Sequence, residues 1–132
     1  MEMTILGCGG SAGVPMVGGV DGAGDWGLCD PCEPRNARLR SSVLLRDDTG
    51  NALLVDTGPD LRAQLLAQRI TRVDAVLYTH AHADHIAGLD ELRAINRIIG
   101  RPIPAYGTRD VIDELVTRFD YVFRPWTPPS FY

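Results

Sequence analysis

The three histidines of this chain are clustered in the sequence. All three fall within the six residues His80-Ala81-His82-Ala83-Asp84-His85, directly after the apolar run 73–78. A short apolar run bounded by polar residues predicts a buried β-strand, so the histidines are expected where a strand ends and a helix begins. Imidazoles beside a carboxylate are donors that transition metals prefer. Residues 80–85, the histidine window, therefore predict a metal centre at the end of this strand.

The spacing of these donors suggests how they divide between two ions. Alternate side chains of an extended segment share a face, so His80 and His82 are predicted to reach one metal. Asp84 and His85 begin the following helix, where the backbone changes direction, and are predicted to face a second metal. Two ions about 3.5–4 Å apart can stabilise the attacking and leaving oxygens of a hydrolysis. The alternative is a polar surface loop in which Asp84 only caps the helix.

The rest of the chain alternates between strand and helix patterns. Strands are predicted at 3–6, 42–45, 52–55, 73–78 and 101–106, and helices at 61–69, 86–99 and 109–119. The turn residues 47–51 predict a hairpin between the second and third strands. The helix over 86–99 is expected to end at Gly100, and the strand at 73–78 to be buried on both faces. The pattern indicates an α/β fold.

A glycine-rich turn follows the first strand. The letters Gly7-x-Gly9-x-x-Ala12 match a dinucleotide-binding pattern, which requires a helix to begin at the turn. Pro15 and further glycines follow instead, and this composition does not sustain a helix. The sequence therefore predicts a loop. Within it, the Ser11 hydroxyl either donates to a substrate phosphate or serves the turn itself.

Composition narrows the class of protein. The 132 residues are predicted to form one domain that buries its core without disulfides. The net charge of −4 argues against a general nucleic-acid-binding surface, while a local RNA or nucleotide contact stays open. With no secretory signal and no apolar stretch of about 20 residues, a cytoplasmic protein outside the membrane is expected. Arg40, with Arg35 and Arg38, forms a basic cluster that either contacts a substrate phosphate or is a solvated face.

The cysteines give a second metal-binding hypothesis. Cys29 and Cys32 have the spacing of a zinc knuckle, but a closed structural zinc site needs four donors. The third cysteine, Cys8, is distant in the sequence, and an odd number of cysteines does not make a disulfide framework. Cys29 and Cys32 are therefore candidates for a structural zinc, with reduced thiols in a loop as the alternative.

Several segments together resemble one family. Thr79-His80-Ala81-His82-Ala83-Asp84-His85 resembles the HxHxDH signature of the metallo-β-lactamase fold superfamily. Residues 7–15, 29–36, 40–45 and 56–60 are similar to the branch that contains the phosphoribosyl cyclic phosphodiesterase. The tRNA 3′-processing endonuclease and the PQQ-biosynthesis protein B are similar relatives. The resemblance extends over about residues 3–132.

This resemblance implies half of an αβ/βα sandwich, with a mixed sheet and helices on one face. It implies that His80 and His82 hold the first of two Zn²⁺ ions (or Mn²⁺), and that Asp84 and His85 hold the second, with Asp84 also catalytic. Asp56 either bonds a ligand imidazole or tightens its turn. Members of the group are about twice as long and take further ligands from their later half. The chain is accordingly expected to be an N-terminal half: a truncated reading frame, a fragment, or one gene of a split pair.

The function expected from this site is metal-dependent hydrolysis, with a metal-bound hydroxide attacking a small phosphate ester or cyclic phosphate. One alternative is hydrolysis of a thioester or lactone at the same site. The other is a non-catalytic metal-binding half that docks with a complementary C-terminal half or a second copy. Four ligands shared by two ions leave each ion under-coordinated. Weak or mononuclear metal binding and little catalysis are therefore expected from these residues alone.

Overall fold

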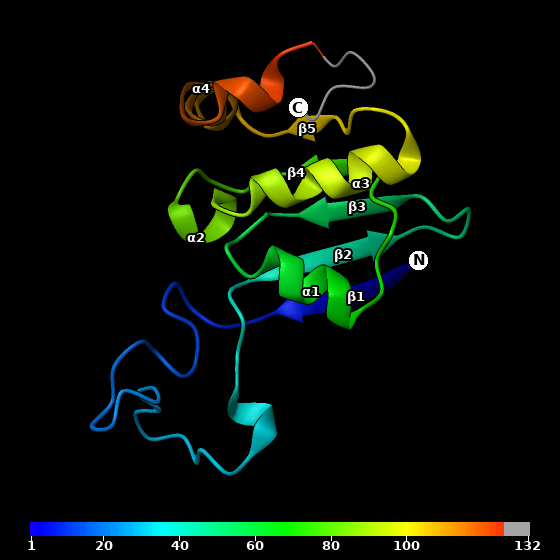
Figure 1. The fold of residues 1–132 in the computed structure, drawn as a ribbon. Helices are drawn as coiled ribbons and strands as arrows, with labels where there is room; N and C mark the ends of the chain where they lie inside the picture. The colour runs from blue at the N-terminus through cyan, green and yellow to red at the C-terminus, as the bar shows by residue number, and fades with distance from the viewer. Residues whose placement is uncertain (126–132) are drawn as a thin grey trace.

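The computed structural model describes residues 1–125 and is built on one five-stranded sheet. In spatial order its strands are β1 (Glu2–Gly7), β2 (Ser42–Arg46), β3 (Ala52–Val55), β4 (Ala75–Leu77) and β5 (Ala105–Tyr106). The pairs β1–β2 and β2–β3 are antiparallel, whereas β3–β4 and β4–β5 are parallel (Figure 1). The expected α/β class with a mixed sheet is confirmed. The proline-rich segment from residue 126 onward lies outside the described residues.

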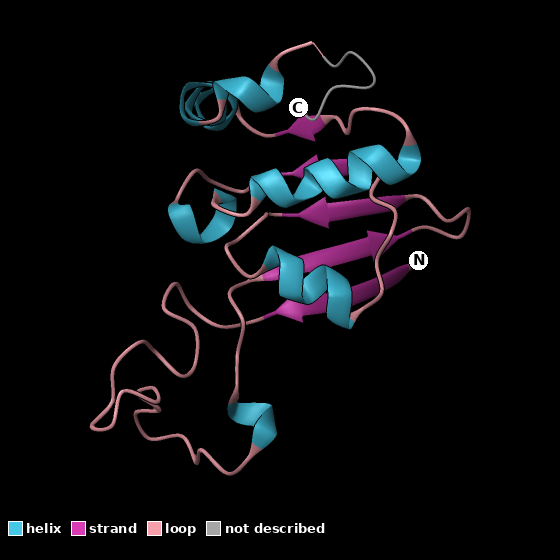
Figure 2. Ribbon diagram, in the orientation of Figure 1, coloured by secondary structure: helices cyan, strands magenta, loops and turns pink. Residues whose placement is uncertain are grey.

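The helices lie over one face and beyond one edge of this sheet. They are α1 (Leu61–Ala67), α2 (Ala83–Ile86), α3 (Leu92–Ile99) and α4 (Arg109–Arg118), with short 3-10 turns at Pro34–Asn36, Leu89–Glu91 and Asp120–Phe123. Figure 2 shows α1 and α3 in front of the sheet, as expected for helices on one face, and α4 beyond the β5 edge. No helix within residues 1–125 is long and apolar enough to cross a membrane.

The face beneath these helices holds the core. Leu44, Leu54 and Val76 are register partners in one row across the sheet, and each is at most 1% exposed. They form one apolar cluster with Leu61 of α1 and Ile95 of α3. Burying each such side chain stabilises the fold by about 1.5–3 kcal/mol, so this row anchors the parallel pair β3–β4.

The opposite face of the sheet is apolar and open within the described part of the chain. Its most exposed members are Met3 at 63%, Ile5 at 59% and Tyr106 at 55%. The strand at 73–78 was expected to be buried on both faces, and this is wrong, because Leu77 is 38% exposed. The strand register places these side chains in two rows: Met3, Leu45, Leu53 and Ala75, then Ile5, Val43, Val55, Leu77 and Tyr106.

The helix predicted over 86–99 is interrupted. α2 ends at Ile86 and α3 begins only at Leu92, while Gly100, with φ 71°, ends α3 as expected. At the interruption the Gly88 N–H donates to the Thr57 carbonyl at 2.8 Å, and a Cβ on Gly88 would overlap the Gly58 carbonyl. A tertiary contact between two distant segments therefore replaces the helical hydrogen bonds that the local pattern favoured.

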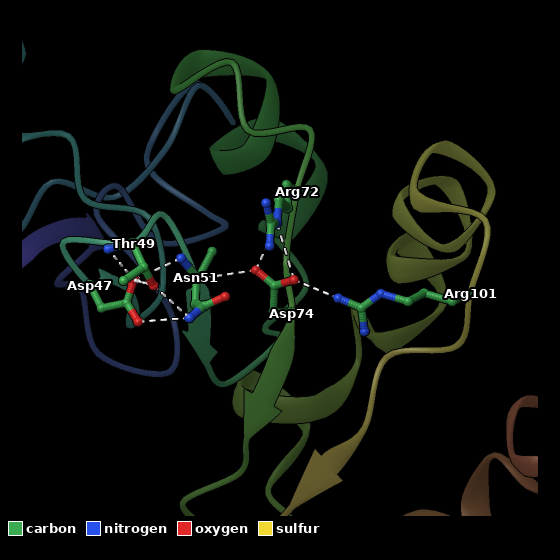
Figure 3. A network of polar contacts seen from close by, with 7 residues as sticks. Asp47, Thr49, Asn51, Arg72, Asp74 and Arg101 are labelled. Atoms are coloured by element: carbon green, nitrogen blue, oxygen red, sulfur yellow. Dashed lines mark hydrogen bonds and ion pairs between the residues drawn. The ribbon is translucent and has the colours of Figure 1, made fainter.

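Polar side chains tie together the end of the sheet where β4 begins (Figure 3). The Asp74 carboxylate accepts from Arg72 Nε and from the Ala52 N–H, both at 2.9 Å, and pairs with Arg101 at 2.5 Å. The Arg72 hydrogen bond is the main reason that the pKa of Asp74 lies below its ordinary value. In the neighbouring hairpin turn, bonds from Thr49 and Asn51 lower the pKa of Asp47 to about 2. This end of β4 is structural, and the chemistry-bearing residues lie at its other end.

Candidate metal centre

The candidate site forms where β3 and β4 end side by side. Because the two strands are parallel, their carboxyl ends meet at the same edge of the sheet. Asp56 directly follows β3, and Thr79 and His80 follow β4. The Asp56 N–H donates to the Leu77 carbonyl at 2.9 Å, and the Thr79 N–H donates to Asp56 Oδ1 at 2.8 Å. These bonds place the Asp56 carboxylate directly beside the histidine window.

Asp56 is the centre of the polar contacts in this site. It is 4% exposed and has a backbone φ of 60°, a left-handed conformation that non-glycine residues adopt mainly where the surroundings enforce it. Its Oδ2 atom accepts from Thr79 Oγ1 at 2.7 Å and lies 2.7 Å from His85 Nδ1. Asp56 thus contacts the imidazole of His85, one of the predicted metal ligands. That this contact supports a bound metal stays a prediction.

The four predicted ligands form one cluster. The His80 ring centroid lies 4.7 Å from that of His82 and 4.0 Å from that of His85. Asp84 Oδ2 lies 3.4 Å from His85 Nε2. Among residues 1–125, however, no three His, Cys, Asp or Glu side chains are arranged as they stand to hold a metal ion. The structure brings the four side chains together, and their assignment as ligands stays a prediction.

The chemistry of this cluster fits a transition-metal ion. A histidine that binds metal usually directs its other ring nitrogen to a carboxylate, as His85 does with Asp56. That contact leaves His85 Nε2 on the side of Asp84. The alternative in which Asp84 only caps the helix does not match the structure, because the N-cap of α2 is His82 and no side chain makes a capping bond.

Close backbone packing holds the turn after β3 against α2. The Thr57 N–H donates to the His85 carbonyl at 2.7 Å, and a Cβ on Gly58 would overlap the Asp84 carbonyl oxygen. Thr57 Oγ1 also bonds the Tyr78 hydroxyl at 3.1 Å, and burial raises the pKa of that phenol. Sequence reasoning did not single out Gly58. The signal available for it was the Asp-Thr-Gly-Pro turn that opens a helix.

An open cavity of about 340 Å³ lies beside the histidines. His80 and His82 line one side of it, and Asp110, Glu114 and Arg118 of α4 line the other. Arg118 also donates to the Ala81 carbonyl at 3.0 Å, which ties α4 to the histidine window. A larger, mainly apolar cavity of about 480 Å³ lies between α3, the β5 strand and residues 121–125, and no histidine lines it.

Arg40 flanks the same turn from the other side. Gly58 lies between Arg40 and Asp84. A Cβ on this glycine would lie 3.7 Å from Arg40 Cβ and would overlap the Asp84 carbonyl. Arg40 Nε lies 3.0 Å from Asp60 Oδ2, and the arginine side chain is 27% exposed. In the same basic cluster, Arg35 pairs with Glu33 at 2.7 Å, and Arg38 donates to the Arg35 carbonyl.

The glycine-rich turn after β1 is a loop, as predicted. It runs beside residues 38–40, with the Gly9 N–H donating to the Leu39 carbonyl at 2.8 Å, and no helix begins there. Ser11 is exposed in this turn, and within residues 1–125 no hydrogen bond joins it to the histidine cluster. Its contact with a substrate phosphate therefore stays a prediction.

The three cysteines, Cys8, Cys29 and Cys32, are exposed, free thiols. In the part of the chain that the structure describes, neither Cys29 nor Cys32 belongs to a group of three potential metal donors. A structural zinc at this pair stays a hypothesis, which zinc titration of a Cys29→Ser, Cys32→Ser variant tests.

The fold and the histidine cluster agree with comparisons to known proteins. Residues 51–130 match the model of the beta-lactamase superfamily domain. The chain is 39% identical to an octanoyltransferase of Porphyromonas gingivalis over 97% of its own length and 25% of that protein. A solved diphosphatase of the PhnP family is 41% identical, with a TM-score of 0.79 over 90% of this chain and 46% of that one.

Two more solved structures are similar. A zinc-bound PqqB from Methylobacterium extorquens is 27% identical, with a TM-score of 0.69 over 94% of this chain and 43% of that one. Human tRNase Z, short form, is 25% identical, with a TM-score of 0.59 over 92% of this chain and 40% of that one.

In this α/β fold, imidazoles and carboxylates lie together at the ends of the parallel strands. These two features define the class of protein. The chain belongs to the beta-lactamase superfamily. The resemblance to the branch with the cyclic phosphodiesterase and the tRNA-processing endonuclease is confirmed by the PhnP-family and tRNase Z structures. The chain spans a quarter of the octanoyltransferase and less than half of each of these structures.

Proposed function

We propose that this chain belongs to a metal-dependent hydrolase that acts on a phosphate ester or cyclic phosphate, as a phosphodiesterase. The observation that carries the proposal is the convergence of His80, His82, Asp84 and His85 beside the buried Asp56 carboxylate. The 41% identity to a PhnP-family diphosphatase supports phosphate chemistry. The zinc-bound state of the PqqB structure supports zinc as the metal, with manganese as the other choice.

In this proposal His80 and His82 hold the first ion, and Asp84 and His85 hold the second. Divalent ions at such a site supply Lewis-acid polarisation of a phosphoryl oxygen. Asp84 is the catalytic residue, because its carboxylate lies 3.4 Å from His85 Nε2 beside the ends of the parallel strands, where it would orient the attacking water. Asp56 orients the His85 ring through its contact with Nδ1.

Binding of the substrate phosphate is assigned to Arg40 and Ser11. Arg40 is partly exposed, and Asp60 fixes its orientation next to the turn that packs against Asp84. A guanidinium is suited to phosphate oxygens because it donates several hydrogen bonds in one plane. Ser11 lies in the glycine turn that pairs with residues 38–40, and its hydroxyl is exposed to solvent. A small phosphate ester is thus the proposed substrate class.

We also propose that the open apolar face of the sheet is covered in the working protein. The two apolar rows across β1 to β5 include Met3, Ile5 and Tyr106, each more than half exposed. Extended apolar patches of this kind mark surfaces that another element covers. A complementary half of the sandwich is the proposed cover, with a second copy of the chain as the alternative. The remaining metal ligands would come from that half.

An acyl substrate, such as a thioester or lactone, is the second candidate. It is favoured by the 39% identity to part of an octanoyltransferase, although the matched part is only 25% of that protein. A fold of this kind does not by itself select the bond that is cleaved.

Parallel assays of the complete gene product, loaded with zinc, distinguish the two candidates. The proposal predicts turnover of bis(p-nitrophenyl) phosphate that exceeds turnover of a thioester. His82→Ala and Asp84→Ala should each lower the phosphodiester rate by at least about a hundredfold, because each removes a metal ligand. Arg62→Ala, an exposed change on α1, is the matched control and should leave the rate unchanged. Activity that survives both site changes, or activity only on the thioester, would contradict the proposal.

A further inference from the structure

Thr79 connects the Asp56 carboxylate to the imidazole of His80. Its hydroxyl oxygen lies 2.7 Å from Asp56 Oδ2 and 2.9 Å from His80 Nδ1. The same Asp56 oxygen lies 2.7 Å from His85 Nδ1. One carboxylate oxygen is therefore linked to two imidazoles, directly to His85 and through the threonine hydroxyl to His80.

The hydrogens available to these groups determine which group donates and which accepts in each hydrogen bond. An ionised carboxylate only accepts hydrogen bonds, so the single hydroxyl hydrogen of Thr79 points at Asp56. Toward His80 the hydroxyl can then only accept, and His80 Nδ1 must carry a hydrogen. By the same reasoning His85 Nδ1 carries a hydrogen, because it also faces the carboxylate. In both neutral rings the lone pair is left on Nε2.

We infer that Thr79 is a positioning residue that fixes His80 as the Nδ1–H tautomer. A free neutral imidazole favours the opposite tautomer, with the hydrogen on Nε2, so the threonine acts against the intrinsic preference. The tautomer of a metal-binding histidine is set by the bond that its other nitrogen makes. The relevance to catalysis rests on the proposed function, whereas the tautomer itself is a property of the metal-free chain.

The proximity of these groups follows from the fold and not from side-chain flexibility alone. The Thr79 N–H donates to Asp56 Oδ1 at 2.8 Å, so both backbone and side chain of Thr79 are bonded to the same carboxylate. These two bonds hold the hydroxyl at the strand end where His80 begins. Serine at this position keeps the hydroxyl, whereas valine keeps the branched shape and removes only the hydrogen-bonding oxygen.

Nitrogen-15 NMR of the metal-free chain tests the inference. Long-range proton–nitrogen correlations at alkaline pH distinguish a protonated ring nitrogen from one that carries a lone pair. We expect Nδ1–H patterns for both His80 and His85 in the unmodified chain. In Thr79→Val, His80 should shift toward the Nε2–H pattern while His85 keeps its own. Thr79→Ser should restore the original pattern of His80.

The unchanged His85 pattern serves as the internal control that the site is still folded. As a second measurement, Thr79→Val should weaken zinc binding by about 10–100-fold, and Thr79→Ser should restore it. An Nε2–H pattern for His80 in the unmodified chain, or in Thr79→Ser, would overturn the inference. So would a His80 pattern that Thr79→Val leaves unchanged. None of these spectra depends on activity. The tautomer inference can therefore fail while the proposed function stands, and the proposed function can fail while the tautomer inference stands.

Discussion

Asp56→Asn is expected to lower the zinc affinity of the chain by about 10–100-fold. Asparagine keeps the size of the side chain and is among the residues that tolerate a left-handed backbone, so the φ of 60° is retained. One carboxylate oxygen is replaced by an NH₂ group that cannot accept a hydrogen bond. In either amide orientation that group faces a donor, which is the Thr79 N–H or the pair Thr79 Oγ1 and His85 Nδ1. His85 therefore loses its acceptor in one orientation and keeps only a neutral amide oxygen, a weaker acceptor than a carboxylate, in the other.

The same change should reduce the free energy of unfolding by about 1–3 kcal/mol, because a partly buried donor loses its carboxylate acceptor. Zinc competition against a chromophoric chelator measures the affinity, and denaturant unfolding of the metal-free chain measures the stability. Asp113→Asn is the control, since Asp113 is an exposed residue of α4 that pairs with Arg109. Equal zinc affinities for Asp56→Asn and Asp113→Asn would show that the Asp56 carboxylate does not support the site.

Gly58→Ala is expected to destabilise the fold by about 3 kcal/mol. A Cβ at this position would overlap the Asp84 carbonyl oxygen, which is backbone and cannot rotate away. The turn after β3 and the α2 segment must then separate, and the Thr57–His85 backbone bond of 2.7 Å lies at that contact. Because α2 carries Asp84 and His85, zinc binding should fall together with stability.

Gly10→Ala is the matched control for this glycine. A Cβ on Gly10 would meet nothing within 4 Å, and the residue does not have a positive φ. Its stability should stay within about 0.5 kcal/mol of the unmodified chain. The two variants are compared by denaturant unfolding. If Gly58→Ala is as stable as Gly10→Ala, the packing of this turn against α2 is not what holds the site.

The sequence was sufficient to predict those features that depend on neighbouring residues. Two short apolar runs and the 47–51 turn predicted the β2–β3 hairpin, which forms with the expected antiparallel pairing. The predicted ligands could be chosen because His80 to His85 are adjacent in the chain, so a strand end is enough to bring them together.

Features that depend on distant segments were not predictable in this way. The helix break at Gly88 exists because that residue bonds Thr57, which lies 31 positions earlier. The exposure of Leu77 depends on which layer covers the second face of the sheet, and an apolar strand pattern does not state this. The part played by Thr79 requires the carboxylate of Asp56, which reaches it only because β3 and β4 are parallel.

Zinc titration of the 132-residue chain and two double variants tests the central claim most directly. The histidine variant carries His80→Ala and His82→Ala, and the cysteine variant carries Cys29→Ser and Cys32→Ser. We expect weak uptake of about one ion by the unmodified chain, since the ligands present suffice for one site. We also expect loss of uptake in the histidine variant and unchanged uptake in the cysteine variant. Uptake that survives in the histidine variant, or that disappears with the cysteines, would contradict the account.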